Sequence, residues 1–289
     1  MNKPYIEFKK QRDFGALLSD TFNFIRNEFK PFMKTIFTIS GPALTVFLLT
    51  TALYTYSAGE TMNMDIFEVL SYQFTNPIFY LYYLMLFVAI MFISTSSLHY
   101  IKSYIANSGN VNSEEIKRNV YKTLTGFLGL GFLKWATLTI TLSLCILPAL
   151  YFMVPMYIVL SIYVFNENSN VSDSYSKSYS LVNADFWVSL GIIIVVAILV
   201  YILNFIVALP AAIYTLIGTG IFSGEIDPGA SVLQPDPIFI FLNILSNIFS
   251  VVLNVVPIIC GVFLYFHLNE KVNFTGTYER ISNIGNTED

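Results

Sequence analysis

The sequence predicts an all-α fold, a polytopic membrane helix bundle of about six transmembrane helices in three hairpins, each preceded by a cytoplasmic amphipathic helix. Apolar residues make up 55% of the 289 residues and charged residues only 12%, whereas an ordinary soluble domain is about one quarter charged. The mean hydropathy is +0.63. Long runs without charge alternate with short segments that hold nearly all the basic residues. These observations indicate a multi-pass membrane protein.

Six charge-poor runs are long enough to cross a hydrocarbon layer of ~30 Å, which takes about 20 helical residues. They lie near residues 35–56, 77–101, 123–147, 148–165, 186–217 and 237–268. A tight turn within residues 144–150, marked by Pro148, separates the third run from the fourth. The fifth run is longer than a bilayer requires, so we expect it to tilt or to break at Pro210, and Pro257 is expected to kink the sixth.

The distribution of basic residues predicts the orientation. Every Lys and Arg except Lys134 lies in segments that six spans would place on one side of the membrane. In the loops at residues 60–68 and 225–236, on the other side, all the charged residues are acidic. Because basic residues resist translocation, the N- and C-termini should both be cytoplasmic. Independently of the charges, an even number of spans returns the C-terminus to the side of the N-terminus.

The charge of the chain also bears on its partners. The formal net charge of −4 argues against nucleic acid, which requires a concentrated basic face. The basic cluster at residues 3–34 stands beside the first apolar run, where each cation gains roughly 1 kcal/mol from anionic headgroups. Membrane lipids are therefore the expected partners, and another membrane protein complex is the alternative.

A repeated pattern precedes the odd-numbered runs. Apolar residues recur at helical spacing in residues 14–32, more faintly in 112–124, and again in 175–186. Asn112 or Ser113 is the expected cap of the middle segment. These helices are expected to lie in the membrane interface, although the first alternatively forms a soluble helix pair. The pattern predicts three similar units within one integral membrane domain, residues 1–289. The units cover approximately residues 8–106, 112–166 and 172–270, and residues 271–289 form a polar cytoplasmic tail.

Polar residues within the apolar runs are the candidate functional positions. Lys134 either faces the bundle interior or extends past Trp135 to the cytoplasmic headgroups. The sixth run carries a polar stripe that should point into the bundle, where it either bonds to neighbouring helices or lines a hydrated pathway. The candidate intramembrane positions are Lys134, Asn204, Asn243, Asn247 and Asn254.

The sequence predicts no catalytic, cofactor-binding or metal-binding residues. His99 and His267 both lie near the cytoplasmic ends of helices, and a centre that needs several histidines cannot be built from two. Cys145 and Cys260 lie in apolar runs and are interpreted as small hydrophobic residues. The glycines within residues 126–131 lack the spacing of a dinucleotide-binding loop and instead predict close helix packing.

Two stretches carry a family resemblance: Ser-Tyr-Ser-Leu-Val-Asn-Ala-Asp-Phe-Trp at residues 178–187, and Leu-Tyr-Phe-His-Leu-Asn-Glu at residues 264–270. They resemble bacterial multi-pass proteins of the YciC-like and glycerophosphodiester-phosphodiesterase membrane-domain group. The tail at residues 275–281 is similar to Bacteroidota members, some labelled carotene oxygenase. The resemblance implies a helical bundle in the bacterial inner (cytoplasmic) membrane and supplies no catalytic residue, because phosphodiesterase activity in fused relatives belongs to a separate soluble barrel.

Two functional hypotheses follow. The first is a non-enzymatic membrane protein that binds or organises lipid or a partner complex, and it rests on the interfacial aromatic residues and the lack of catalytic groups. The alternative is a transporter or permease that uses Lys134 and the asparagine stripe of the sixth run. An intramembrane enzyme ranks third, because no paired Asp, Glu or His is expected at membrane depth.

Overall fold

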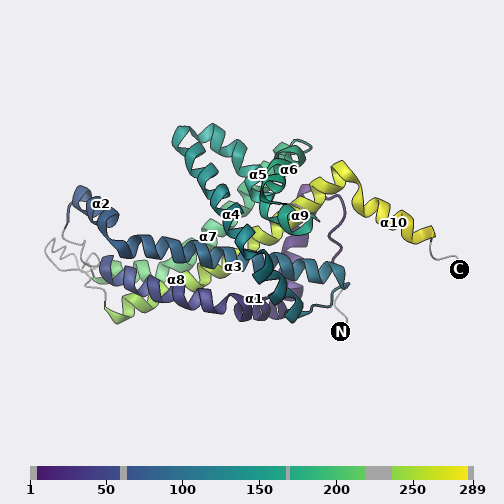
Figure 1. Ribbon diagram of the computed structural model, residues 1–289. Helices are drawn as coiled ribbons and strands as arrows, with labels where there is room; N and C mark the ends of the chain where they lie inside the picture. The colour runs from purple at the N-terminus through teal and green to yellow at the C-terminus, as the bar shows by residue number, and fades with distance from the viewer. Residues whose placement is uncertain (1–4, 59–63, 167–169, 219–235, 286–289) are drawn as a thin grey trace. The chain divides into compact units, whose positions relative to one another are not determined.

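The computed structural model describes residues 5–58, 64–166, 170–218 and 236–285. In these ranges the chain forms ten α-helices and no strand, which confirms the predicted all-α class (Figure 1). The helices are α1 (Phe14–Ala58), α2 (Ile66–Thr75), α3 (Pro77–Ala106), α4 (Ser113–Leu144), α5 (Ile146–Phe165), α6 (Val171–Val182), α7 (Phe186–Gly218), α8 (Pro237–Leu253), α9 (Val255–Asn273) and α10 (Thr275–Gly285).

Six helical segments among the described residues are long and apolar enough to cross a membrane: α1, α3, α4, α5, α7 and the consecutive pair α8 and α9. An 18-residue stretch within each has a mean hydropathy between 1.5 and 3.2. The number agrees with the prediction, and the fold is that of an all-α polytopic bundle. This composition is compatible with an integral membrane protein.

Local signals in the sequence determine where α4 and α5 begin. The side chain of Asn112 accepts hydrogen bonds from two N–H groups in the first turn of α4, at 3.1 and 3.3 Å, as expected of an N-cap. Cys145, in an extended conformation, is the residue between α4 and α5, so the tight turn lies where it was predicted. Pro148 stands in the first turn of α5, where a missing N–H costs nothing.

The structure also shows where the amphipathic segments and the long apolar runs are continuous and where they are divided. The first amphipathic segment and the first apolar run form one continuous helix, α1, and the same holds for α4, whereas α6 is separate from α7. Helix α7 continues through Pro210 without a break. The sixth run is divided at Asn254, three residues before Pro257. The reason is steric, because a proline has no N–H and its ring clashes with the carbonyl four residues earlier, here that of Leu253.

Two helices, α2 and α10, lie outside the six predicted apolar runs. Asp65 and Glu68 form a reciprocal capping box at the start of α2, and Asp236 caps α8. Residues 60–63 and 225–235 of the two acidic loops lie outside the described residues. In the C-terminal tail, the buried Glu270 carboxylate accepts the Gly276 N–H at 2.7 and 3.0 Å at the start of α10, where an anion stabilises the helix N-terminus.

The chain divides into two compact units. The first contains Met1–Ile39, Met91–Ile198 and Val255–Asp289, and the second contains Ser40–Ile90 and Leu199–Asn254. Helices α1, α3 and α7 therefore each contribute residues to both units. This division cuts across the residue ranges of the three predicted repeats, and the repeat itself stays a prediction.

The core of the first unit includes the segment that precedes α1. Phe8 is only 1% exposed, and its ring stacks on Phe263 with centroids 4.3 Å apart. The rings of Phe24, Tyr104 and Phe266 surround it at 5.4, 6.1 and 6.0 Å. Burial of a phenylalanine side chain contributes about 1.5–3 kcal/mol, so this segment is an integral part of the packed unit.

The glycines of α4 confirm the prediction of close helix packing in the first unit. A Cβ atom on Gly126 would overlap the Tyr163 hydroxyl of α5, and one on Gly131 would overlap the Met91 sulfur of α3. Gly129, on another face of α4, has no atom within 4 Å of such a Cβ. Two of the three glycines therefore lie at close contacts with neighbouring helices, whereas Gly129 does not.

We expect Gly126→Ala to destabilise the protein by about 1–3 kcal/mol, because the Tyr163 ring must leave its packed position. Gly129→Ala is the matched control, and it should be neutral or stabilising by up to about 1 kcal/mol because alanine is the better helix former. Thermal unfolding in detergent micelles measures both. Equal shifts of Tm for the two variants would contradict the packing role of Gly126.

Candidate functional site

The five predicted polar positions belong to different units. Lys134 lies in the first unit, on α4, and Asn204, Asn243, Asn247 and Asn254 lie in the second, on α7 and at α8. Each group is therefore described within its own unit.

The four asparagines bond mainly to their own helices. Each side-chain amide donates to the carbonyl four residues earlier, at distances of 2.8–3.0 Å. The contact between α8 and α7 is made instead by the Ser246 hydroxyl, which donates to the Val207 carbonyl at 3.1 Å. The Asn204 Oδ1 atom is buried without a hydrogen-bond partner. One amide N–H of each asparagine is thus bonded within its own helix, as short polar side chains often are.

Lys134 is half-buried on α4 and is followed by the half-exposed Trp135. Among the described residues, no ion pair or hydrogen bond involves its ammonium group. An unpaired ammonium is costly in hydrocarbon. The position of Lys134 therefore constrains how deeply α4 enters a membrane.

A groove in the first unit, here called the α1–α4 groove, has a volume of about 390 Å³. This volume lies in the range of ligand-binding pockets. The groove runs between the middle of α1, the end of α3 and the start of α4. Its lining residues are Pro31, Lys34, Thr35, Thr38, Ile39, Tyr100, Val111, Ser113, Glu114 and Lys117.

The charges of the α1–α4 groove favour an anion. Lys34 and Lys117 approach it from two different helices, and neither ammonium has an ion pair within the described part of the chain. The N-terminus of α4, which carries a partial positive charge, opens on the same groove. Glu114 adds one carboxylate at the rim. The groove can therefore hold a phosphate group and a neighbouring cationic group at the same time.

The hydroxyl groups of the groove are partly committed elsewhere. Thr35 and Thr38 donate to carbonyls of α1, at 2.9 and 2.8 Å, and Tyr100 donates to the buried Glu28 carboxylate at 3.0 Å. These three hydroxyl oxygens remain acceptors only. The two lysines are therefore the principal donors for a bound anion.

A second polar cluster in the first unit connects the N-terminal segment to α9. The Arg12 backbone N–H donates to His267 Nδ1 at 3.1 Å, so the other ring nitrogen carries the proton. That nitrogen lies 3.3 Å from Asp185 Oδ2, which also accepts from the Lys271 ammonium at 2.7 Å. The Arg12 guanidinium is buried and donates to Asp20 at 2.8 Å. Every member of this cluster has a partner, and the cluster connects the N-terminal segment to α9 and to the start of α7.

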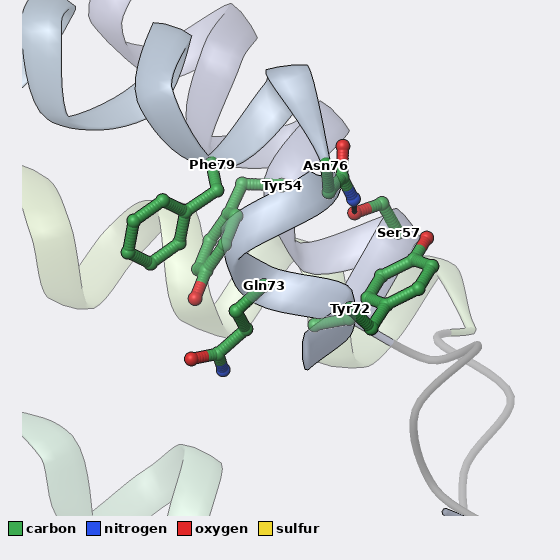
Figure 2. A pocket seen from close by; sticks show the side chains of 7 residues that line it. Tyr54, Ser57, Tyr72, Gln73, Asn76 and Phe79 are labelled. Carbon is green, nitrogen blue, oxygen red and sulfur yellow. Dashed lines mark hydrogen bonds between the residues drawn. The ribbon is translucent and has the colours of Figure 1, made fainter. Parts of the chain in front are cut away.

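A small pocket in the second unit lies where α1 ends and α2 meets α3 (Figure 2). Its volume is about 10 Å³, which is room for about one water molecule. The Asn76 side chain donates to the Ser57 hydroxyl at 2.9 Å, as the dashed line in Figure 2 shows. The Tyr54 ring stacks on Tyr82 with centroids 4.6 Å apart. The bond between Asn76 and Ser57 connects the end of α1 to the junction of α2 and α3, and the pocket is too small for a ligand.

Comparison with known proteins gives no relationship: no family model, curated protein or solved structure matches this chain. Within the described residues, no group of three or more His, Cys, Asp or Glu side chains lies close enough to hold a metal ion. The geometry of the α1–α4 groove is therefore the main evidence on function.

Sequence reasoning placed Lys34 near headgroups but did not pair it with Lys117. The two residues are far apart in the chain, and the intervening α3 brings them to one groove. The signal that could have found the pair is the Asn112 cap with a lysine one turn into α4, since a helix N-terminus beside a cation is a common anion site.

Asp185 should make stability depend on pH. Burial raises its pKa, but hydrogen bonds from Lys271 and His267 outweigh burial and hold the pKa below the ordinary value of 3.8. A carboxylate whose pKa is lowered by folding stabilises the protein above its unfolded pKa and loses that contribution as pH falls through the folded pKa. We therefore expect the wild type to lose more Tm than Asp185→Asn on acidification from about pH 5 to about pH 3. Parallel pH profiles would contradict this role.

Proposed function

We propose that this protein binds phospholipid headgroups through their phosphate in the α1–α4 groove. The observation that carries the proposal is the convergence of Lys34 and Lys117, both without a carboxylate partner, on one groove of about 390 Å³. Each lysine near a membrane surface contributes roughly 1 kcal/mol toward an anionic lipid. A phosphate between the two lysines would be the counter-ion that the described residues do not supply.

The position of the groove along α1 favours a lipid over a soluble anion. Lys34 is the last charged residue of α1, and residues 35–58 contain none. The groove therefore lies where the apolar part of α1 begins, which in a membrane is the level of the headgroups. Pro31, Ile39 and Val111 supply apolar walls against which the start of an acyl chain can pack.

The location and orientation that we propose are the bacterial inner membrane with both termini in the cytoplasm. The proposal is supported by the basic segments, which the cytoplasmic side retains, and by the resemblance to the YciC-like group. In this arrangement the groove opens toward the cytoplasmic leaflet. The protein then acts as a scaffold that holds lipid, with a partner membrane complex as a further ligand.

We do not advance the permease alternative on the present contacts. It would require Asn204, Asn243 and Asn247 to present free amide groups to a pathway. One N–H group of each of these amides is instead bonded to a carbonyl of its own helix, which favours a packing role.

The double variant Lys34→Gln/Lys117→Gln should weaken binding of phosphatidylglycerol roughly 30-fold, because two contributions of about 1 kcal/mol are lost. Titration of lipid into the purified protein in neutral detergent, followed by native mass spectrometry, measures the affinity. Lys30→Gln/Lys122→Gln is the matched control: it removes the same charge from exposed positions on α1 and α4 outside the groove. Equal losses in the two double variants would show that net charge, and not the groove, attracts lipid.

Glu114 should decide which headgroup the groove prefers. Glu114 lines the same groove as Lys34 and Lys117, so its carboxylate can pair with the amine of an ethanolamine headgroup. Glu114→Gln should therefore weaken phosphatidylethanolamine and strengthen phosphatidylglycerol in the same titration. An unchanged preference would remove Glu114 from the site, and binding of inorganic phosphate with equal affinity would indicate a soluble anion as the ligand.

A further inference from the structure

The end of the α4–α5 hairpin is an exposed apolar surface. Here the hairpin tip is residues 132–153, centred on the turn at Cys145. Leu144 and Leu147, on either side of the turn, are each 75% exposed. The other exposed apolar side chains of the tip are Phe132, Leu133, Trp135, Ile140, Leu142, Ile146 and Tyr151. A contiguous apolar surface of this kind marks an interaction site.

The rest of the hairpin is packed inside the first unit. On α5, nearly every residue from Val154 to Val164 is buried. On α4, the buried residues before the tip extend as far as Gly131. The tip offers 13 residues on the α4 arm (132–144) and 8 on the α5 arm (146–153), and a complete crossing of the hydrocarbon takes about 20.

A polar helix lies beside the hairpin at the base of the tip. The Tyr175 hydroxyl of α6 is 3.1 Å from the Thr137 hydroxyl of α4, and the Tyr179 ring meets the Phe152 ring of α5 with centroids 5.9 Å apart. Helix α6 exposes a polar face made of Ser172, Asp173, Ser176 and Ser180. Such a face requires water or headgroups, so Thr137 and Phe152 cannot lie deep in hydrocarbon.

A second contact also places the base of the tip near the membrane surface. The Tyr151 ring stacks on Phe186, the first residue of α7, with centroids 5.6 Å apart. Phe186 follows Asp185, which is paired with Lys271, so this level of the protein is charged. The turn at Cys145 is six residues from Tyr151, about 9 Å along a helix at 1.5 Å per residue.

Lys134 agrees with this depth. It precedes the turn by eleven residues, about 16 Å of helix, and its ammonium has no partner among the described residues. With Trp135 beside it, Lys134 has the composition of a residue pair at the membrane interface. Beyond Lys134, the remaining residues of the tip carry no charge.

We propose that the hairpin tip inserts into a single leaflet and does not cross the bilayer. The tip lies among the acyl chains of one leaflet, the leaflet on the side of the membrane where α7 begins and α9 ends. Lys134, Trp135 and Tyr151 then lie at the headgroups, and Cys145 lies in the hydrocarbon. Four of the six apolar segments cross, namely α1, α3, α7 and the α8–α9 pair, and the two termini still face the same side. The proposal does not depend on the α1–α4 groove.

The native cysteines allow a direct test on the unaltered protein. Cys145 is exposed and Cys260 is fully buried, so labelling reports on the tip. We expect a membrane-impermeant maleimide to leave Cys145 unmodified both in intact cells and in inverted membrane vesicles, and to modify it in mild detergent. Labelling from outside intact cells would establish a full crossing. Labelling in inverted vesicles would show that the tip is not inserted, and absence of labelling in detergent would show that it is not exposed.

Two cysteine variants serve as controls that identify the two sides of the membrane. Ser176→Cys, on the exposed face of α6, should react in inverted vesicles, and Ser71→Cys, exposed on α2, should react in intact cells. Cys260→Ser confirms that the signal belongs to Cys145. A membrane-permeant bimane on Cys145 should then be quenched by lipids that carry a nitroxide on the acyl chain. Unquenched bimane would mean that a protein partner covers the tip, which would also overturn the proposal.

Discussion

The free-energy cost of an unpaired charge away from water determines where the charged side chains of this protein lie. In the described residues of the second unit, the charged side chains are Asp65, Glu68 and Asp236, and all three stand at helix starts, where backbone N–H groups receive them. In the first unit, Arg12 is buried but is bonded to Asp20 and to backbone carbonyls. The cations that lack such partners must lie where water or lipid headgroups can solvate or pair with them. This requirement puts the α1–α4 groove and the base of the hairpin tip at the membrane surface.

The packing of the first unit depends on the short segment before α1. Phe8 fills an aromatic cluster with residues of α1, α3 and α9, and the Arg12 guanidinium lies 4.7 Å from the Phe263 ring centre. The Arg12 backbone then fixes His267, and His267 fixes Asp185 at the start of α7. A segment without regular structure thus connects helices that are distant in sequence, because its polar groups are satisfied by side chains.

Much of the helical content follows from the sequence, because apolar run length and capping residues are local signals. Asn112 caps α4 as predicted, and the turn at Cys145 falls within the expected seven residues. The break at Asn254, three residues before Pro257, is likewise a local effect, whereas the continuity of α1 depends on how neighbouring turns pack. The presence of Lys34 and Lys117 in one groove, and the contact of α6 with Thr137, depend on how distant segments pack. Composition identified α4 and α5 as apolar enough to cross, whereas only these contacts indicate how deeply they enter.

The groove and the tip are the two ends of the same helix. Lys117 lies in the second turn of α4 and Lys134 lies seventeen residues later, about 26 Å along the helix axis. If both lysines meet headgroups, α4 between them follows the membrane surface obliquely instead of passing through it. The exposed Arg118 and Lys122 between them then also face a polar layer. A steep α4 would take Lys134 into hydrocarbon while Lys117 stayed outside, so a shallow α4 is the arrangement that satisfies all of these cations at once.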